Sequence, residues 1–369
     1  MIFAIALSDG SCARMHIEKH IPLASFTTIK LGGIAEQFCA CASVEDIQEA
    51  LGYAREHALA VHVLSGGSNT VFSDSGFRGL VIKVDLKGIS FTQDGADVLV
   101  AAGAGESWDV LVAQCVARGL AGIECLSGIP GSVGATPVQN VGAYGQEVGS
   151  VVERVDAIER ASGTAVSFTS AQCLFGYRTS RFKTTDRDRY IITDVTYRLR
   201  ADGAPAIAYP QLQKAIEERF GSAALEAGKD SLKSVREVVL DLRRSKSMVV
   251  DPQDLNSVSS GSFFTNPILS PQEFARVQAT WKDSGNDLAE IPAYREAGSI
   301  KIPAAWLVEQ SGFEKGYTER NVGISEHHAL ALVNRGGTTS DLLALAAKIE
   351  QAVFEQFGIR LAREPNIIE

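Results

Sequence analysis

The stretch SGGSNTVFSDSGFRG, residues 65–79, decides how the rest of this sequence is interpreted. It directly follows AVHVL (60–64), a short apolar run that is typical of a buried strand. The run from Gly66 to Asn69 offers successive backbone N–H groups together with two side-chain donors. A concave set of donors of this kind suits an anionic phosphate.

A second glycine-rich stretch, SGIPGSVGATPVQNVGAYG (127–145), carries hydroxyl groups and no charge, so neutral donors could bind a pyrophosphate there. Neither stretch is a Walker A loop, and Gly103-Ala104-Gly105 lacks the third glycine of the dinucleotide fingerprint. Glycine-rich stretches are often plain turns. For the two stretches together, we consider two interpretations about equally supported: turns without a ligand, and loops that bind phosphate.

The composition limits the kinds of partner. With 45% hydrophobic and 21% charged residues among 369, the chain has the balance of a folded protein large enough for two or three domains. Its net charge of −9 argues against nucleic acid and anionic membranes, because neutralising phosphates needs a basic surface. The opening MIFAIAL is too short for a signal peptide or a spanning helix.

The six cysteines form no C-x-x-C pair and stand mostly in apolar surroundings, which favours reduced structural thiols in a cytoplasm. The six histidines form no H-x-x-x-H pair with a nearby carboxylate, so we expect no metal site.

Strand and helix patterns alternate along the first half. Ser43 and Asp46 predict a capped helix over 43–59, and strands are expected at 79–84 and 96–102. Three further strand patterns follow the second loop, and the short connection between the first two predicts antiparallel pairing. These patterns are VVERVDAIER (151–160), TAVSF (164–168) and YIITDVTYRLR (190–200).

A helix is expected over 231–246, and the polar turn residues behind it indicate a domain change between about 230 and 250. Beyond that change, Ser270 with Pro271 and Glu273 predicts the start of another helix. A strand at 329–333 and a long helix over 341–358 complete an α+β pattern.

Five motifs stand in the order found in UDP-N-acetylenolpyruvoylglucosamine reductases, and the chain resembles the longer type of that family over residues 20–366. The motifs are the two loops, FGYRTSRFK (175–183), GSFFTNP (261–267) and the Glu-Pro at 364–365. The resemblance implies a two-subdomain FAD-binding fold of the PCMH/vanillyl-alcohol-oxidase type, over 1–88 and 89–235. A C-terminal α+β domain that binds the UDP-sugar would follow over 236–369.

The resemblance also implies the reaction. NADPH would reduce a noncovalently bound FAD, and the flavin would reduce the enolpyruvyl ether of the UDP-sugar to a lactyl ether in peptidoglycan precursor synthesis. The positions that resemble flavin contacts are Gly66, Gly67, Ser68, Asn69, Thr70, Ser127, Gly131, Ser132, Gly134 and Thr136.

Three residues resemble the catalytic set of the family: Ser262, Arg178 and Glu364. The serine would protonate the carbon next to the hydride acceptor, and Phe263 and Phe264 with the flavin would keep competing water away. The arginine would hold the substrate carboxylate in a bidentate fork, with the glutamate as its partner. Without the resemblance, a turn hydroxyl, a surface ion pair and a solvated tail residue would be the simpler interpretations.

Further positions resemble contacts to the nucleotide-sugar, and two positions depart from the common pattern. Thr265 stands where many relatives carry lysine, and Arg363 replaces a proline that fixes the backbone before Glu364. The substrate candidates are Tyr177, Tyr209, Lys246, Asn266 and Gln310, with Arg243, Tyr294 and Lys301 as weaker ones; Arg243 and Lys246 could equally be a solvated helix end.

Two other functions stay open at this point. One is a flavin oxidase or dehydrogenase of the same fold that acts on another alcohol or sugar acid, which would leave GSFFTNP unexplained. The other is a nucleotide-sugar binding protein without turnover, which purification as a colourless protein would favour. For the reductase implied by the resemblance, we expect a monomer.

Overall fold

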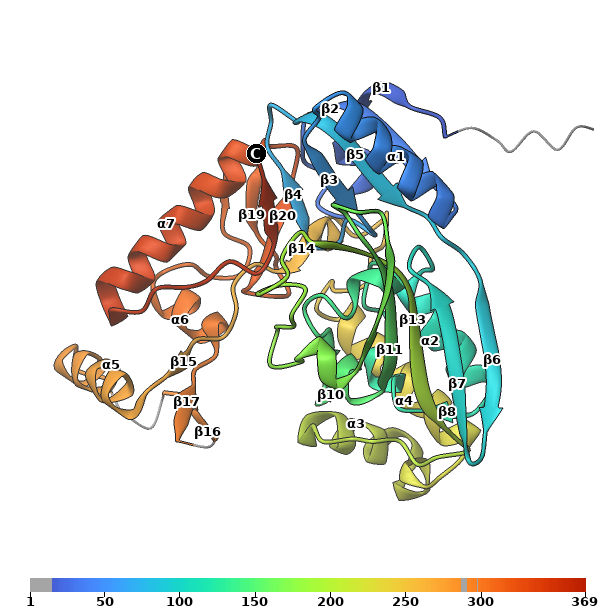
Figure 1. Ribbon diagram of the computed structural model, residues 1–369. Coiled ribbons are helices and arrows are strands. Elements are labelled where there is room, and N and C mark those ends of the chain that lie inside the picture. The colour runs from blue at the N-terminus through green and yellow to red at the C-terminus, as the bar shows by residue number, and fades with distance from the viewer. Residues whose placement is uncertain (1–14, 287–290, 297) are drawn as a thin grey trace, which may run out of the picture.

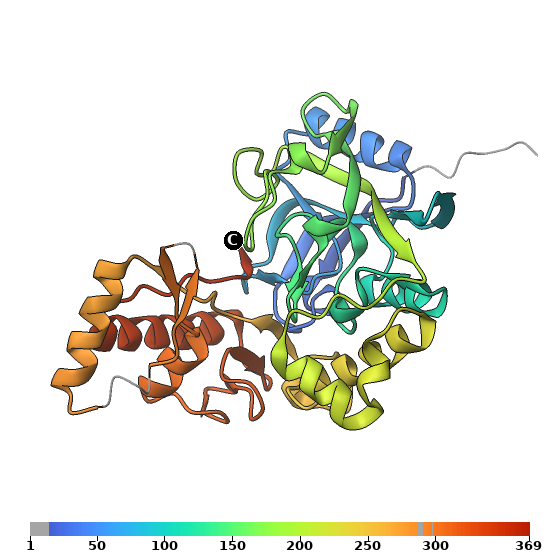
Figure 2. The same ribbon diagram turned by 90° about the horizontal axis from the view of Figure 1, so that it is seen from below.

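The computed structural model describes residues 15–286, 291–296 and 298–369. The opening MIFAIAL segment and Cys12 lie outside these residues. The described chain forms a first sheet, drawn in blue at the top of Figure 1, a second sheet below it in cyan to olive, and a C-terminal body in orange and red beside them. Seen from below, the C-terminal body stands to one side and meets the other two near strand β4 (Figure 2).

The first sheet is built around a parallel core with one helix on its face. Ile47 and Leu51 of the helix are buried in the same cluster as Leu80 and Ile82 of the sheet. As predicted, Ser43 and Asp46 close a capping box at the helix start. The strand order is β1 (Glu18–Pro22), β2 (Ile34–Cys41), β5 (Phe77–Val84) and β3 (Val61–Leu64), with α1 (Val44–Glu56) as the helix.

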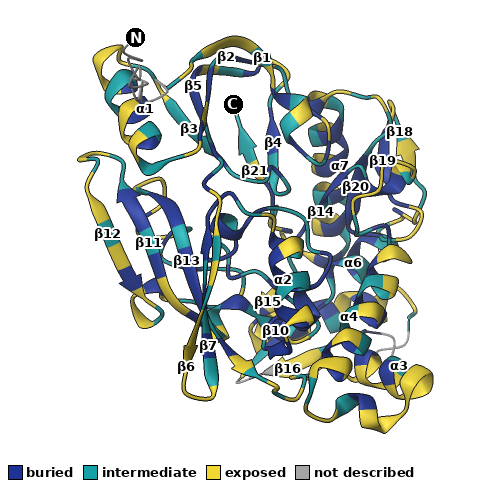
Figure 3. Cartoon of the chain, turned by 90° about the vertical axis from the view of Figure 1, so that its right-hand side faces the viewer, coloured by how far each residue is buried: buried dark blue, intermediate teal, exposed yellow. Residues whose placement is uncertain are grey.

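The second sheet is antiparallel throughout, which confirms the pairing expected for the strands after the second loop. Its outer strand β6 is largely exposed, whereas the central strand β13 is mostly buried (Figure 3). The order is β12 (Ala165–Thr169), β11 (Val152–Glu159), β13 (Tyr190–Ala201), β7 (Asp97–Gly103) and β6 (Ile89–Asp94), with β8 (Leu120–Ala121) added on β13 and a separate hairpin of β9 (Gly142–Ala143) and β10 (Gln146–Glu147).

Three helices accompany this second sheet. Helix α4 packs against α2 and α3, and Val235, Val238 and Val239 of α4 share a buried cluster with Leu212 and Ile216 of α3. The expected domain boundary at 235/236 falls inside α4, so we place the boundary in the polar segment that follows this helix. The helices are α2 (Trp108–Ala117), α3 (Pro210–Phe220) and α4 (Lys229–Arg244).

The C-terminal body combines two small antiparallel sheets with three helices. Ser270 and Glu273 close the predicted capping box of α5, with Pro271 in the first turn. One sheet runs β14 (Ser259–Ser262), β20 (Ala331–Asn334), β19 (Val322–Ile324) and β18 (Thr318–Glu319), and the other β15 (Ile268–Leu269), β17 (Ser299–Lys301) and β16 (Tyr294–Glu296). The helices are α5 (Pro271–Asp283), α6 (Ala304–Gln310) and α7 (Thr339–Phe357).

The C-terminal segment returns to the first subdomain. Strand β21 (Asn366–Ile368) pairs in parallel with β4 (Thr70–Phe72), which directly follows the first glycine-rich loop. The Asp74 carboxylate accepts the backbone N–H groups of Thr339 and Ser340 at the start of α7, at 2.7 and 2.8 Å. The loop that resembles a flavin contact is therefore held by the C-terminal body.

The thiols of Cys39, Cys41, Cys115, Cys125 and Cys173 are free and buried. Among the described helices, none is long and apolar enough to cross a membrane.

Candidate active site

A cleft of about 690 Å³ lies where the two sheets and the C-terminal body meet. Both glycine-rich loops, the tip of FGYRTSRFK, the end of β14 and the segment before β21 contribute to its wall. This volume is in the range that small-molecule and cofactor sites occupy. The predicted site residues on its wall are Gly66, Gly67, Ser68, Asn69, Thr70, Gly131, Ser132, Gly134, Thr136, Arg178, Ser262 and Glu364.

The two glycine-rich loops touch each other along this wall. A Cβ on Gly66 would lie 2.5 Å from the Cα of Gly131, so neither loop leaves room for a side chain there. Gly67 has φ +64°, and a Cβ on it would lie 1.9 Å from the carbonyl oxygen of Phe26. Glycine is required at these positions by the protein's own backbone.

The first loop presents unused donors to the cleft. Among the described residues, no hydrogen bond is donated by the backbone N–H of Gly66, Gly67, Ser68 or Asn69. Four successive free N–H groups form a cradle for an oxyanion without any side-chain charge. This donor set fits the pyrophosphate of a dinucleotide such as FAD.

Several predicted flavin contacts use their side chains inside the protein. The Thr136 hydroxyl donates to Val133 O at 2.8 Å and pairs with the Tyr197 hydroxyl, and Ser132 pairs with Ser65. The Ser127 hydroxyl donates to Glu124 O at 2.6 Å, and Ser127 does not line the cleft. The structure therefore does not bring Ser127 to the other flavin candidates.

Arg178 sits at the tip of a tight turn. The backbones of Gly176 and Thr179 exchange two hydrogen bonds of 3.1 Å, so Tyr177 and Arg178 are the two central residues. Arg178 has φ +52°, a left-handed conformation that few residues adopt without support. The turn places the guanidinium in the cleft, where its Nε lies 3.4 Å from Oε1 of Glu364.

Ser262 ends β14 at the cleft, while the two phenylalanines behind it point away. Phe263 and Phe264 are 0% and 1% exposed within the C-terminal core, and neither ring lines the cleft. The expectation that these rings would cover the serine is therefore wrong. They fix its backbone instead, with the Phe263 N–H donating to Leu330 O at 2.7 Å.

Glu364 joins the first glycine-rich stretch to the segment that carries Ser262. Its N–H donates to Phe263 O at 2.9 Å, and its own carbonyl oxygen accepts from Nδ2 of Asn69 at 3.2 Å. Burial raises the pKa of its carboxyl group, although Arg178 and Lys183 oppose that rise. The glutamate thus faces the cleft in a setting that favours proton uptake more than water does.

At the two positions that depart from the family pattern, Thr265 and Arg363, local contacts hold the backbone. Arg363, in place of proline, forms a two-point ion pair with Glu350, at 2.6 and 2.9 Å. The Thr265 N–H donates to Ala362 O at 3.0 Å, next to the bridge between Phe264 and Arg363. These contacts hold the backbone before Glu364 without a rigid ring.

The predicted substrate contacts divide into two groups, and among them only Arg243 lines the cleft. In the first group, Lys301 Nζ lies 4.4 Å from the centre of the Tyr177 ring. Lys301 is the cross-strand neighbour of Tyr294. Asn266 interacts with the Tyr177 hydroxyl and accepts the Ala304 N–H at the start of α6.

The second group lies near α3 and α4. The Tyr209 ring meets the Tyr144 ring edge-on, 5.7 Å between centres. Lys246 lies close enough to His328 to contribute, with burial, to a lowered imidazole pKa of about 4. Arg243 is 8% exposed and, unlike Lys246, does line the cleft. Gln310 is exposed at the end of α6, with no hydrogen bond to the described residues.

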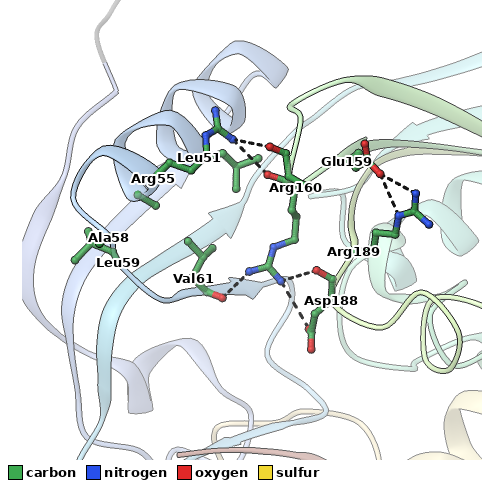
Figure 4. A pocket seen from close by; sticks show the side chains of 11 residues that line it. Leu51, Arg55, Ala58, Leu59, Val61, Glu159, Arg160, Asp188 and Arg189 are labelled. Atoms are coloured by element: carbon green, nitrogen blue, oxygen red, sulfur yellow. Dashed lines mark hydrogen bonds and ion pairs between the residues drawn. The ribbon is translucent and has the colours of Figure 1, made fainter.

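Sequence reasoning missed Arg160, which spans the two subdomains at the far end of the cleft. Its guanidinium donates to Val61 O at 2.8 Å and to Asp188 O at 2.9 Å. Figure 4 shows this arginine at the base of a second cavity of about 430 Å³ between α1 and the turn after β11. Arg160 lines both cavities, and its place at the end of VVERVDAIER was the only signal in the sequence.

Within the described parts of the chain, no three His, Cys, Asp or Glu side chains gather as a metal site would require. The cradle of neutral donors and the cleft at a junction of three bodies fit a protein that binds a dinucleotide. Comparison with known proteins defines the class as a flavin-binding oxidoreductase: the FAD binding domain profile matches residues 35–169, and that of the UDP-N-acetylenolpyruvoylglucosamine reductase C-terminal domain matches 252–368.

The chain belongs to the UDP-N-acetylenolpyruvoylglucosamine reductase family, as the resemblance implied. It is 46% identical to the reductase of Thermobifida fusca, over 95% of this chain and 97% of that protein. It is 43% identical to that of Streptomyces coelicolor, over 93% and 88%. A crystal structure of the Thermus caldophilus reductase shares the fold, with a TM-score of 0.64 at 22% identity and coverage of 96% and 100%.

Proposed function

We propose that this protein reduces the enolpyruvyl ether of UDP-N-acetylglucosamine enolpyruvate to the lactyl ether of UDP-N-acetylmuramate, with NADPH as the reductant of bound FAD. The observation that carries this proposal is the convergence of Arg178, Glu364 and Ser262 on the same cleft that the donor cradle lines. The family relation and the fit of the cradle to a pyrophosphate support it. Bound FAD would accept hydride from NADPH and deliver it to the substrate.

The residues of this chain divide the remaining work. The cradle from Gly66 to Asn69 would bind the pyrophosphate of FAD. Arg178 would take the substrate carboxylate in its planar fork and oppose the negative charge that grows there. The hydroxyl of Ser262 would give its proton to the carbon beside the hydride acceptor, and Glu364 would orient Arg178.

We assign Tyr177, Asn266, Lys301 and Tyr294 to the mouth of the substrate site, since they cluster beside the Arg178 turn. We assign Lys246 and Tyr209 to the nucleotide end. We further propose a cytoplasmic enzyme, because both substrates are soluble nucleotides, and a monomer, because a single copy of the chain brings the cradle, Arg178, Glu364 and Ser262 to one cleft.

Separate measurement of the two half-reactions tests the proposal. Ser262→Ala is expected to leave anaerobic reduction of the flavin by NADPH nearly unchanged and to slow its reoxidation by the enolpyruvyl substrate by roughly 10²-fold or more, the scale of a general acid. Ser262→Cys should recover part of that rate. The matched control is Ser260→Ala, which removes a hydroxyl two residues earlier on the same strand and should leave both rates unchanged. If the enolpyruvyl substrate does not reoxidise the reduced flavin of the wild-type enzyme, the proposed function is refuted.

A further inference from the structure

Lys183 contacts the Arg178 turn from inside the cleft, and the reaction described above gives it no task. Its Nζ donates to the carbonyl oxygen of Arg178 at 3.1 Å. Like Arg178 and Glu364, it lines the cleft and is only partly exposed. The neighbouring Phe182 is 7% exposed, and its N–H donates to the Ser180 hydroxyl at 3.1 Å, so the segment that carries Lys183 is held firmly.

Lys183 adds a second cation beside the pair of Arg178 and Glu364. Oε1 of Glu364 lies 3.4 Å from Nε of Arg178. Lys183 lies close enough to Glu364 for the two charges to attract each other. Two cations, Arg178 and Lys183, therefore lie with one carboxylate, Glu364, on the wall of the cleft.

Burial lowers the Lys183 pKa, partly offset by Glu364, and raises the Glu364 pKa, partly offset by Arg178 and Lys183. Tyr177 also faces Glu364, and Arg187 lies near Lys183. Arg187 is 69% exposed and pairs with Asp188, so its charge is largely screened. Removal of the lysine charge would leave Arg178 and Glu364 as a neutral pair where an anionic ligand has to bind.

We propose that Lys183 is a positioning residue for the substrate carboxylate: it balances the charge of Glu364 and holds the backbone of Arg178, so that the guanidinium can accept a carboxylate. The inference rests on the proposed function and goes beyond it. It assigns Lys183 a charge that attracts the substrate, whereas Arg178 and Ser262 would contact the substrate itself. A lysine that merely supported the turn would need its hydrogen bond and not its charge.

Two substitutions separate these roles. Lys183→Gln keeps a donor for the Arg178 carbonyl oxygen and removes the charge, whereas Lys183→Arg keeps the charge. We expect Lys183→Gln to weaken binding of the enolpyruvyl substrate to the oxidised enzyme by roughly 10- to 100-fold, the contribution of a charge-assisted contact. Lys183→Arg should retain most of the affinity. FAD content should match wild type in both.

The measurements are substrate titration followed by flavin absorbance, and the pH profile of flavin reoxidation. The limb that reports Glu364 should move to higher pH in Lys183→Gln, because an opposing cation is lost. Arg187→Gln, which removes an exposed charge from the same wall, serves as the matched control and should bind substrate as wild type does.

Three results would overturn the inference: wild-type substrate affinity in Lys183→Gln, an equal loss in Arg187→Gln, or an equal loss in Lys183→Arg. Loss of FAD from Lys183→Gln alone would assign the lysine to the architecture of the cleft and would equally refute the proposal. Failure of the proposed function is a different result, since it appears as wild-type flavin that the substrate does not reoxidise.

Discussion

Replacement of Gly67 by alanine tests the cradle, because the chain contains a matched control. Gly67 and Gly95 have nearly the same positive φ, +64° and +63°. A Cβ on Gly95 would meet nothing within 4 Å, whereas one on Gly67 would lie 1.9 Å from Phe26 O. Gly95→Ala therefore measures the cost of left-handed backbone alone, and Gly67→Ala adds the collision.

The expected magnitudes follow from this geometry. Gly95→Ala should lower the free energy of unfolding by about 1 kcal/mol and leave FAD binding unchanged. In Gly67→Ala the loop has to move by about 1.5 Å, from 1.9 Å to an ordinary contact distance of 3.4 Å, and a displacement of aligned groups by even about 1 Å costs roughly 10²-fold. We expect the affinity for FAD to fall by at least that factor. The obstacle in this variant is the Phe26 carbonyl oxygen.

The assay is titration of each apoprotein with FAD, followed by quenching of flavin fluorescence, with thermal unfolding of the apoproteins as a second measurement. The apo form of Gly67→Ala should be destabilised more than that of Gly95→Ala. If the two variants bind FAD equally well, the four free N–H groups do not hold the cofactor and the assignment of the cradle is refuted.

Two further predictions concern the C-terminal body and acid stability. Arg363→Ala should lower the free energy of unfolding by about 1–2 kcal/mol, and it should slow flavin reoxidation because Glu364 is displaced. If the losses of unfolding free energy in Arg363→Ala and Glu350→Ala simply add in the double variant, the ion pair does not have this role. Burial lowers the pKa of His62 and of His328 from 6.5 to about 4, so the unfolded state binds more protons in that interval. Stability should be complete above pH 6.5 and fall toward pH 4, by up to about 3 kcal/mol for each imidazole. The test is urea unfolding of His328→Asn and wild type at pH 6.5 and pH 4. If both proteins lose the same unfolding free energy between these pH values, His328 does not contribute to the acid sensitivity.

The sequence predicted what short-range chemistry determines. The capping boxes at Ser43 and Ser270 set both helix starts at the predicted residues. The helix expected over 231–246 runs from Lys229 to Arg244, within the usual uncertainty of helix ends. Helix α3 was missed, although Pro210 at its first position is a recognised start signal.

The sequence predicted which motifs form the candidate site, but it did not predict how their strands pair or where their side chains lie. The strands β4 and β21 have three residues each, too few for a hydrophobic period, and their pairing joins distant parts of the chain. The hydroxyl of Ser127 looked available because a sequence does not show that a carbonyl oxygen three residues earlier accepts it. The rings of Phe263 and Phe264 likewise gave no sign of which side of the strand they would occupy.

The pairing of β21 with β4 has a consequence for biosynthesis. Residues 70–72 leave the ribosome early, but their partner strand follows only after the whole C-terminal body has been translated. Until then the edge of β4 has no neighbour there, and the loop before it lacks the contact between Asn69 and Glu364. Contacts between such distant segments form late in folding, since closing a long loop costs entropy. A nascent chain would therefore complete its coenzyme cradle only after translation of the strand that carries Ser262.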